Sequence, residues 1–215
     1  MGYERLGLVH IYTGNGKSKT TTAFGMALRA VGQNLRVHVI QFLKGGAYTG
    51  ELLASARHLP NLEITQFGKP CIKEKMQIKL NTFTGEENNP DEKKEPEMEY
   101  YREDVECGPC RFCFLADKEE QRLGREAFEH AKFILSSDLY QLVILDELCV
   151  TVQKGIVSIK EACDLIKSKP KHVELILTGR GCPQELIDLA DYVTETIQVK
   201  HPMDKGIFGR RGIEY

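Results

Sequence analysis

The residues from Thr13 to Thr21 have the types and spacing of a loop that binds phosphate. They follow an apolar run that predicts a strand and precede a run that predicts a helix, which is the context such a loop needs. Glycines let backbone N–H groups turn toward phosphate oxygens, and the helix N-terminus adds its partial positive charge. Lys19 would add a mobile positive charge, and the Thr20 hydroxyl could hold Mg²⁺. The residues expected to bind nucleotide phosphate are Thr13, Gly14, Asn15, Gly16, Lys17, Ser18, Lys19, Thr20 and Thr21.

This loop departs from the usual pattern G-x4-G-K-[ST] at both glycines. Thr13 stands in place of the first glycine, and Ser18 stands in place of the second. The Cβ atom of Ser18 either changes how closely the backbone approaches phosphate or fits there if its φ angle is negative. The alternative interpretation is a glycine-rich turn between a strand and a helix, with surface lysines and no ligand.

A second element favours nucleotide binding. The apolar run at 142–145 predicts a buried strand, and Asp146 and Glu147 follow it directly, as in a Walker B element. Asp146 could coordinate Mg²⁺ directly or through water, and Glu147 could be a second metal partner or a general base. Because acidic residues end many strands, this motif predicts a nucleotide site only in combination with the loop.

Four of the seven cysteines have the spacing of metal ligands. Three lie in a C-x2-C-x2-C run, and the fourth lies upstream. The expected ligands are Cys71, Cys107, Cys110 and Cys113. Four thiolates can hold a [4Fe–4S] cluster or complete a zinc site, and one tight run with a remote fourth cysteine favours iron–sulfur. Zinc and no metal are the alternatives. We expect Cys149, Cys163 and Cys182 to be small, partly buried side chains without such a role.

Strand and helix patterns alternate along the chain. Short apolar runs predict strands at 6–12, 36–42, 62–67, 142–145, 173–178 and 192–199. Helices are expected at 19–31, 51–57, 117–136, 158–167 and 183–190. Such alternation predicts a parallel sheet covered by helices on both faces, with the ligand site at the carboxyl ends of the strands. Together with the phosphate loop, it predicts an α/β fold of the P-loop NTPase-like (RecA-like) class.

Two of these helices have a predicted buried face. In the helix at 19–31, the stripe expected to face the sheet is Phe24, Ala27, Leu28 and Val31. The helix at 117–136 begins with Asp117 and Glu120, whose spacing is typical of a capping box. Its expected buried stripe is Leu123, Ala127, Ala131, Ile134 and Leu135.

Length and composition indicate one domain over residues 1–215. Within it, the polar, cysteine-bearing segment 68–115 breaks the alternation, so we expect an insertion that is pinned at its ends. The net charge of −2 argues against a surface that coats nucleic acid. No apolar run approaches membrane-spanning length, and the first residues lack the apolar stretch of a signal peptide. We therefore expect a cytoplasmic protein with reduced thiols that binds neither nucleic acid nor a membrane.

Longer motifs extend from the loop and from the Walker B strand, and a third group lies near the C-terminus. The first group comprises 12–21, 23–25 and 39–45, and the second comprises 145–148. The third comprises 177–181, 183–187, 190–191, 199–202, 206–207 and 212–215. Together they resemble the P-loop type of ATP:corrinoid adenosyltransferase, and the C-terminal group is the most diagnostic because generic P-loop ATPases lack it.

The resemblance implies a transferase that joins the 5′-deoxyadenosyl group of ATP to Co(I) of a corrinoid, in adenosylcobalamin biosynthesis or salvage. Co(I) would attack C5′, and triphosphate would leave as one unit, unlike in phosphoryl transfer. Lys17, Lys19 and Mg²⁺ would stabilise the charge on the triphosphate, and Glu147 would complete the catalytic set. The residues that would hold Mg²⁺ are Thr20, Asp146 and Glu147.

Further candidates for the nucleotide or corrinoid pocket are Lys44, Glu51, Arg180 and His201. Arg180 also fits a structural role at the end of a strand, and His201 also fits a turn ahead of Pro202. The partners that the resemblance implies are the corrinoid, a protein that supplies reducing electrons, and a second copy of the chain in a homodimer.

The chain departs from the family by having no tryptophan. The family usually carries a glycine-phenylalanine-tryptophan segment before the helix that starts here near Asp117, and this segment is tied to displacement of the lower cobalt ligand. The cysteine-bearing insertion stands in its place. We hypothesise that a metal cluster there folds a lid over the corrinoid or relays an electron to Co(II). The competing functions are a P-loop ATPase or kinase and a non-catalytic metal-thiolate carrier of corrinoid.

Overall fold

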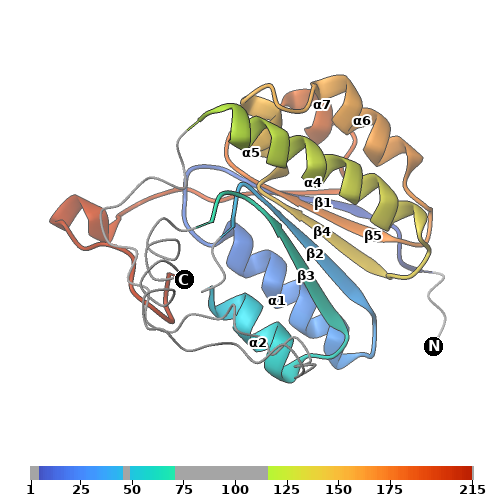
Figure 1. The fold of residues 1–215 in the computed structure, drawn as a ribbon, viewed down its shortest axis with the longest axis horizontal. Helices are drawn as coiled ribbons and strands as arrows, with labels where there is room; N and C mark the ends of the chain where they lie inside the picture. The colour runs from blue at the N-terminus through green and yellow to red at the C-terminus, as the bar shows by residue number, and fades with distance from the viewer. Residues whose placement is uncertain (1–4, 46–48, 71–115, 215) are drawn as a thin grey trace, which may run out of the picture.

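The strands form one parallel sheet (Figure 1). The structure, a computed structural model, describes residues 5–45, 49–70 and 116–214. Within these residues six strands pair in the order β3-β2-β4-β5-β1-β6, and each pairing is parallel. The strands are β1 (Val9–Thr13), β2 (Val37–Phe42), β3 (Leu62–Phe67), β4 (Leu142–Asp146), β5 (Glu174–Thr178) and β6 (Tyr192–Glu195). The helices are α1 (Lys19–Gly32), α2 (Gly50–His58), α4 (Lys118–Ser136), α5 (Leu148–Gln153), α6 (Ile159–Ser168), α7 (Gln184–Ile187) and the 3-10 helix η3 (Pro202–Lys205).

Helices cover both faces of the sheet. Figure 1 shows α4, α5, α6 and α7 on one face and α1 and α2 on the other. Two buried apolar clusters fill these layers: one includes Ile40, Phe42 and Phe128, and the other includes Val39 and Ile144. Successive strand residues point to opposite faces, which is why Val39 and Ile40 belong to different clusters. The predicted α/β fold with a parallel sheet between helices is confirmed.

All the predicted strands are present, and the strand at 62–67 has the predicted bounds. The last strand is shorter than predicted, because β6 lies at the edge of the sheet and the chain leaves it after Glu195 to cross the β1–α1 loop. The predicted helix at 183–190 is also shorter, since α7 ends at Ile187. α5 was not predicted, because no cap or turn residue separates it from β4.

The buried face of α1 differs from the predicted one. Leu28 is 58% exposed, whereas Lys19, Ala23 and Ala27 are buried. Buried positions recur every four residues, and Leu28 lies one residue beyond that stripe, about 100° further round the helix. The prediction for Leu28 was therefore wrong, because the face of α1 that packs on the sheet carries small alanines, Ala23 and Ala27, in place of large apolar side chains.

The N-terminus of α4 lies where it was predicted. The Asp117 side chain accepts a hydrogen bond from the Glu120 amide at 2.9 Å. The reciprocal half of the predicted capping box is wrong, because the Glu120 carboxylate pairs with Lys154 Nζ at 2.6 Å. Of the predicted stripe, Ala127, Ala131, Ile134 and Leu135 are buried and Leu123 is half-buried.

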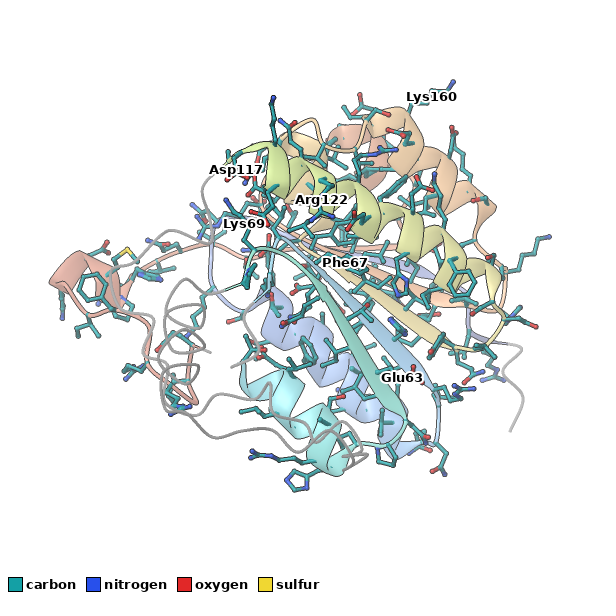
Figure 2. The ribbon with its side chains drawn as sticks, viewed as in Figure 1. Glu63, Phe67, Lys69, Asp117, Arg122 and Lys160 are labelled. Carbon is teal, nitrogen blue, oxygen red and sulfur yellow. The ribbon has the colours of Figure 1, made fainter. Side chains whose placement is uncertain are left out.

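An ion pair connects the residues just before 71–115 with those just after it; the segment 71–115 itself lies outside the described residues. Lys69, whose side chain is 3% exposed, contacts Asp117 Oδ2 at 2.7 Å, and Figure 2 labels both residues beside the start of α4. Among the helices that the structure describes, none has the length and apolar character needed to cross a bilayer.

Candidate active site

The β1–α1 loop is packed against the chain that follows β6. The Gly16 amide donates to the Thr196 carbonyl at 2.9 Å, and the Gln198 amide donates to Asn15 Oδ1 at 3.0 Å. A Cβ atom on Gly14, whose φ is 97°, would lie 2.2 Å from the Thr196 oxygen. Gly14 is therefore required by the close approach of the C-terminal segment as well as by its own backbone conformation.

Ser18 adopts the left-handed conformation, with φ of 91°. The alternative that its φ is negative was therefore wrong. The Ser18 carbonyl accepts from the Thr22 amide at 2.7 Å and so starts α1. A side chain in this region of backbone space costs about 1–2 kcal/mol relative to glycine, so the loop is strained at the residue that precedes Lys19.

The two loop lysines differ in their surroundings. Lys19 is buried, and its ammonium donates to the Gly16 carbonyl at 2.7 Å across the mouth of the loop. Burial lowers the pKa of Lys19, with Glu147 opposing that shift and Arg180 adding to it. The Lys17 side chain is 47% exposed and pairs with Glu214 Oε1 at 2.7 Å. The C-terminal segment therefore already engages one of the predicted phosphate ligands.

Asp146 lies at the carboxyl end of β4 and is fully buried. Its Oδ1 accepts from the hydroxyls of Thr20 at 2.8 Å and Thr178 at 2.7 Å. Its Oδ2 accepts from Gln41 Nε2 at 3.2 Å and from Lys44 Nζ at 2.6 Å. Burial alone would raise the pKa of Asp146, but Lys44 and the two hydroxyls outweigh burial and hold the pKa below its usual value. Asp146 is therefore a buried carboxylate with one cationic partner in Lys44.

Glu147 follows Asp146 in the left-handed conformation, with φ of 67°, and its amide donates to Thr178 Oγ1 at 3.0 Å. Burial, and then the charge of Asp146, raise the pKa of Glu147. Thr20, Asp146 and Glu147 thus bring oxygen ligands together at one end of the sheet. The Lys44 ammonium already contacts Thr20 and Asp146. This donor set fits a small, hard cation such as Mg²⁺.

These residues surround a polar cavity of about 210 Å³. Its wall is formed by Asn15, Gly16, Lys17, Ser18, Lys19, Thr20, Thr21, Lys44, Glu51, Glu147, Arg180, Gln198, His201 and Glu214. Thr13, Gly14 and Asp146, also predicted for the site, are not among the residues that line the cavity. His201 combines its two interpretations, because it lines the cavity while its Nδ1 accepts from the Met203 amide at 3.2 Å and caps η3.

Sequence reasoning did not single out four residues of this site. Thr178 ends β5 beside Asp146, and the rule that ligands gather at the carboxyl ends of strands could have found it. Gln41 is, with His38, one of two polar residues in the otherwise apolar strand β2, which is a usable signal. Glu214 lies in the C-terminal motifs and Gln198 directly precedes one of them, but their residue types alone do not point to the loop.

Metal binding by the cysteine run lies outside the described residues, because Cys71, Cys107, Cys110 and Cys113 all fall within 71–115. In the part of the chain that the structure describes, no group of three or more histidine, cysteine, aspartate and glutamate side chains could hold a metal. Cys149 is buried, and Cys163 and Cys182 are half-buried. The prediction of partly buried side chains is confirmed for Cys163 and Cys182, whereas Cys149 is more deeply buried than predicted.

Comparison with known proteins identifies the family. The family model described as ATP:corrinoid adenosyltransferase BtuR/CobO/CobP matches residues 5–106 and 84–215. The chain belongs to the ATP:corrinoid adenosyltransferase family. Corrinoid adenosyltransferase CobA of Salmonella typhimurium and the corrinoid adenosyltransferase of Escherichia coli K12 are each 32% identical to it, over 99% of this chain and 87% of theirs. The corrinoid adenosyltransferase of Pseudomonas aeruginosa is 29% identical over 99% of this chain and 85% of its own.

The family resemblance that the motifs indicated is therefore confirmed. As an ATP:corrinoid adenosyltransferase, the chain is a transferase whose substrates are ATP and a corrinoid. The cavity at the β1–α1 loop lies where a P-loop fold binds the phosphates of a nucleotide.

Proposed function

We propose that this protein transfers the 5′-deoxyadenosyl group of ATP to Co(I) of a corrinoid and releases triphosphate, in adenosylcobalamin biosynthesis or salvage. Two electrons of Co(I) form the new cobalt–carbon bond at C5′, and the electron pair of the C5′–oxygen bond leaves with the triphosphate. The observation that carries the proposal is the set of cationic side chains that line one polar cavity in a member of this family, Lys17, Lys19, Lys44 and Arg180.

The chemistry requires positive charge along the whole triphosphate, because negative charge grows on the leaving oxygen while the terminal phosphates stay intact. Lys19 and the loop amides would hold one part of the triphosphate at the N-terminus of α1. Lys17 would join them after release from Glu214. Thr20, Asp146 and Glu147 would hold Mg²⁺, which when bound would supply further positive charge at the triphosphate.

The roles of Asp146 and Glu147 follow from the proton balance. Attack by a cobalt electron pair on a carbon atom removes no proton, so the transfer step requires no general base. The raised pKa of Glu147 reflects burial beside Asp146, and a bound cation would bring that pKa down. We therefore assign Glu147, within the catalytic set, to metal or nucleotide binding and not to the role of a general base.

Several broader parts of the proposal rest on the family and on the sequence. The protein would act in the cytoplasm, as a homodimer, on Co(I) that a reductant protein supplies. The organisation would be one domain over residues 1–215 with the insertion at 68–115. Cys71, Cys107, Cys110 and Cys113 would bind an iron–sulfur cluster or zinc, which iron, zinc and sulfide analysis of oxygen-free protein tests directly.

The first test of the activity is the visible spectrum of cob(I)alamin mixed without oxygen with the protein, ATP and Mg²⁺. We expect the Co(I) band to disappear and a light-sensitive alkylcobalamin spectrum to replace it. Lys19→Met should slow this change strongly, whereas Lys160→Met, on an exposed side chain of α6 (Figure 2), should not alter it. A Co(I) band that persists with the wild-type protein would refute the proposal.

A further inference from the structure

Lys44 lies where the proposed function places a divalent cation. Its ammonium is 2.6 Å from Asp146 Oδ2 and 3.5 Å from Thr20 Oγ1. Thr20 and Asp146 are the same two side chains that would hold Mg²⁺. A divalent ion bound to both of them would lie within a few ångströms of the Lys44 ammonium, and two cations at that spacing repel one another.

The backbone of Lys44 is fixed, so its side chain is the part that can move. Leu43 has φ of 60°, and its amide donates to the Phe67 carbonyl at 2.9 Å. The next residue, Gly45, packs so closely on Gly68 that a Cβ atom there would lie 2.0 Å from the Gly68 oxygen. The ends of β2 and β3 therefore hold the Lys44 backbone between them, while its side chain is 27% exposed toward the cavity.

Asp146 requires a positive charge beside it in the nucleotide-free protein. The Asp146 carboxylate has no exposed surface, and its other three donors, Thr20, Thr178 and Gln41, are neutral. An uncompensated carboxylate in such a place is strongly unfavourable. Lys44 supplies the compensating charge, and the same charge opposes the entry of a metal ion.

We propose that Lys44 is a stand-in cation: its ammonium occupies the cation position at Asp146 in the nucleotide-free protein, and it leaves Asp146 when Mg²⁺ enters with ATP. This inference rests on the proposed function, because it takes the Mg²⁺ site from it. It has two consequences. The nucleotide-free site binds divalent ions weakly, and the displaced ammonium, already in the cavity wall, turns its charge toward the triphosphate. Metal and nucleotide therefore bind together.

The test measures Mn²⁺ binding to the nucleotide-free protein by electron paramagnetic resonance, with Mn²⁺ as the probe for Mg²⁺. Removal of the competing ammonium in Lys44→Met should raise Mn²⁺ affinity about ten- to a hundredfold. Lys44→Arg, which keeps the charge, should bind as weakly as the wild type. Lys154→Met, which breaks the comparable pair between Lys154 at the end of α5 and Glu120 of α4, serves as the matched control and should also leave Mn²⁺ binding unchanged.

A second readout shows whether the variants are folded and where the ion binds. Without metal, Lys44→Met should melt at a lower temperature than the wild type. Mn²⁺ should raise the melting temperature of Lys44→Met by more than it raises that of the wild type. The gain in Mn²⁺ affinity should vanish in Lys44→Met with Asp146→Asn. Unchanged Mn²⁺ affinity in Lys44→Met, or a gain that survives Asp146→Asn, would overturn the inference.

The inference and the proposed function can fail separately. Wild-type protein that alkylates cob(I)alamin but shows no effect of Lys44→Met on Mn²⁺ binding would leave the function standing without the stand-in cation. A protein that shows the Mn²⁺ effect but forms no alkylcobalamin would keep the cation exchange and lose the proposed reaction.

Discussion

Asp146→Asn removes one charge from the site while it preserves the hydrogen bonds. The single oxygen of asparagine can accept from Gln41 and Lys44, as Oδ2 does in the wild type. Its amide group can donate to the hydroxyls of Thr20 and Thr178, because a hydroxyl that now donates to Oδ1 can turn and accept instead. The substitution therefore changes the charge and leaves the packing in place.

The cost in stability follows from the replacement of hydrogen bonds to a charged carboxylate by hydrogen bonds to a neutral amide. A bond to a charged group contributes about 1.5–3 kcal/mol and a neutral one about 0.5–1.5 kcal/mol. The free energy of unfolding of the nucleotide-free protein should therefore fall by about 1–3 kcal/mol in Asp146→Asn. Asp146→Leu, which leaves the Lys44 ammonium without its partner, should lower it by about 3–5 kcal/mol. Urea denaturation in the presence of EDTA measures both values.

The same variant should lose most of the benefit that Mg²⁺ gives to ATP binding. Affinity for ATP with Mg²⁺ should fall by about ten- to a hundredfold, which is the usual effect of a substitution at or next to a metal ligand. Affinity in EDTA should change less, because no metal ion then links Asp146 to the triphosphate. Isothermal titration calorimetry under both conditions decides the matter. Equal losses with and without Mg²⁺ would refute the assignment of Asp146 to the cation site.

Three further changes test other parts of the account. Burial, and then the neighbouring His130 ring, lower the pKa of His38 to about 4, so the unfolded chain takes up this proton before the folded protein does. Between pH 7 and pH 5 the free energy of unfolding of the wild type should fall by about 2 kcal/mol more than that of His38→Gln. A substitution of the exposed His58, His58→Gln, should keep the wild-type dependence of stability on pH, and urea titrations at each pH measure all three proteins. Gly14→Ala should destabilise the protein by more than about 2 kcal/mol through its backbone strain and clash. Gly25→Ala, whose Cβ meets nothing within 4 Å, should stabilise α1 by about 0.5–1 kcal/mol. Equal effects of the two substitutions would refute the conclusion that position 14 requires glycine. Glu214→Gln should tighten ATP binding up to about fivefold in a filter assay, because it frees a loop lysine, and weaker binding would show that Glu214 helps to hold the nucleotide.

The sequence was sufficient for the parts of the fold that depend on local pattern. Uninterrupted apolar runs such as 142–145 predicted strands that are buried on both faces. The alternation with helices then placed Thr20 and Asp146 at one edge of the sheet, although 126 positions separate them. The exposed Leu28 shows the limit of this reasoning, because the pattern of apolar residues on a helix does not reveal how closely the helix packs.

The remaining parts of the site depend on contacts between distant segments. Nothing in the residues near Lys44 indicates that its ammonium reaches Asp146, since that contact is set by the left-handed turn at Leu43 and by the pairing of β2 with β4. The crossing of the C-terminal segment over the loop is equally hidden, because Thr196 and Gln198 make it through their backbone atoms and through the Thr196 hydroxyl, and a single threonine does not indicate such a contact. Backbone contacts of this kind leave little trace in residue type.

The phosphorus-containing product of the reaction distinguishes adenosyl transfer from phosphoryl transfer. Oxygen-free protein, ATP, Mg²⁺ and cob(I)alamin should be followed by phosphorus nuclear magnetic resonance while the alkylcobalamin is measured by absorbance. We expect one intact triphosphate for each cobalt–carbon bond formed. ADP and phosphate as the products, with Co(I) unchanged, would contradict it and would assign the site to phosphoryl transfer.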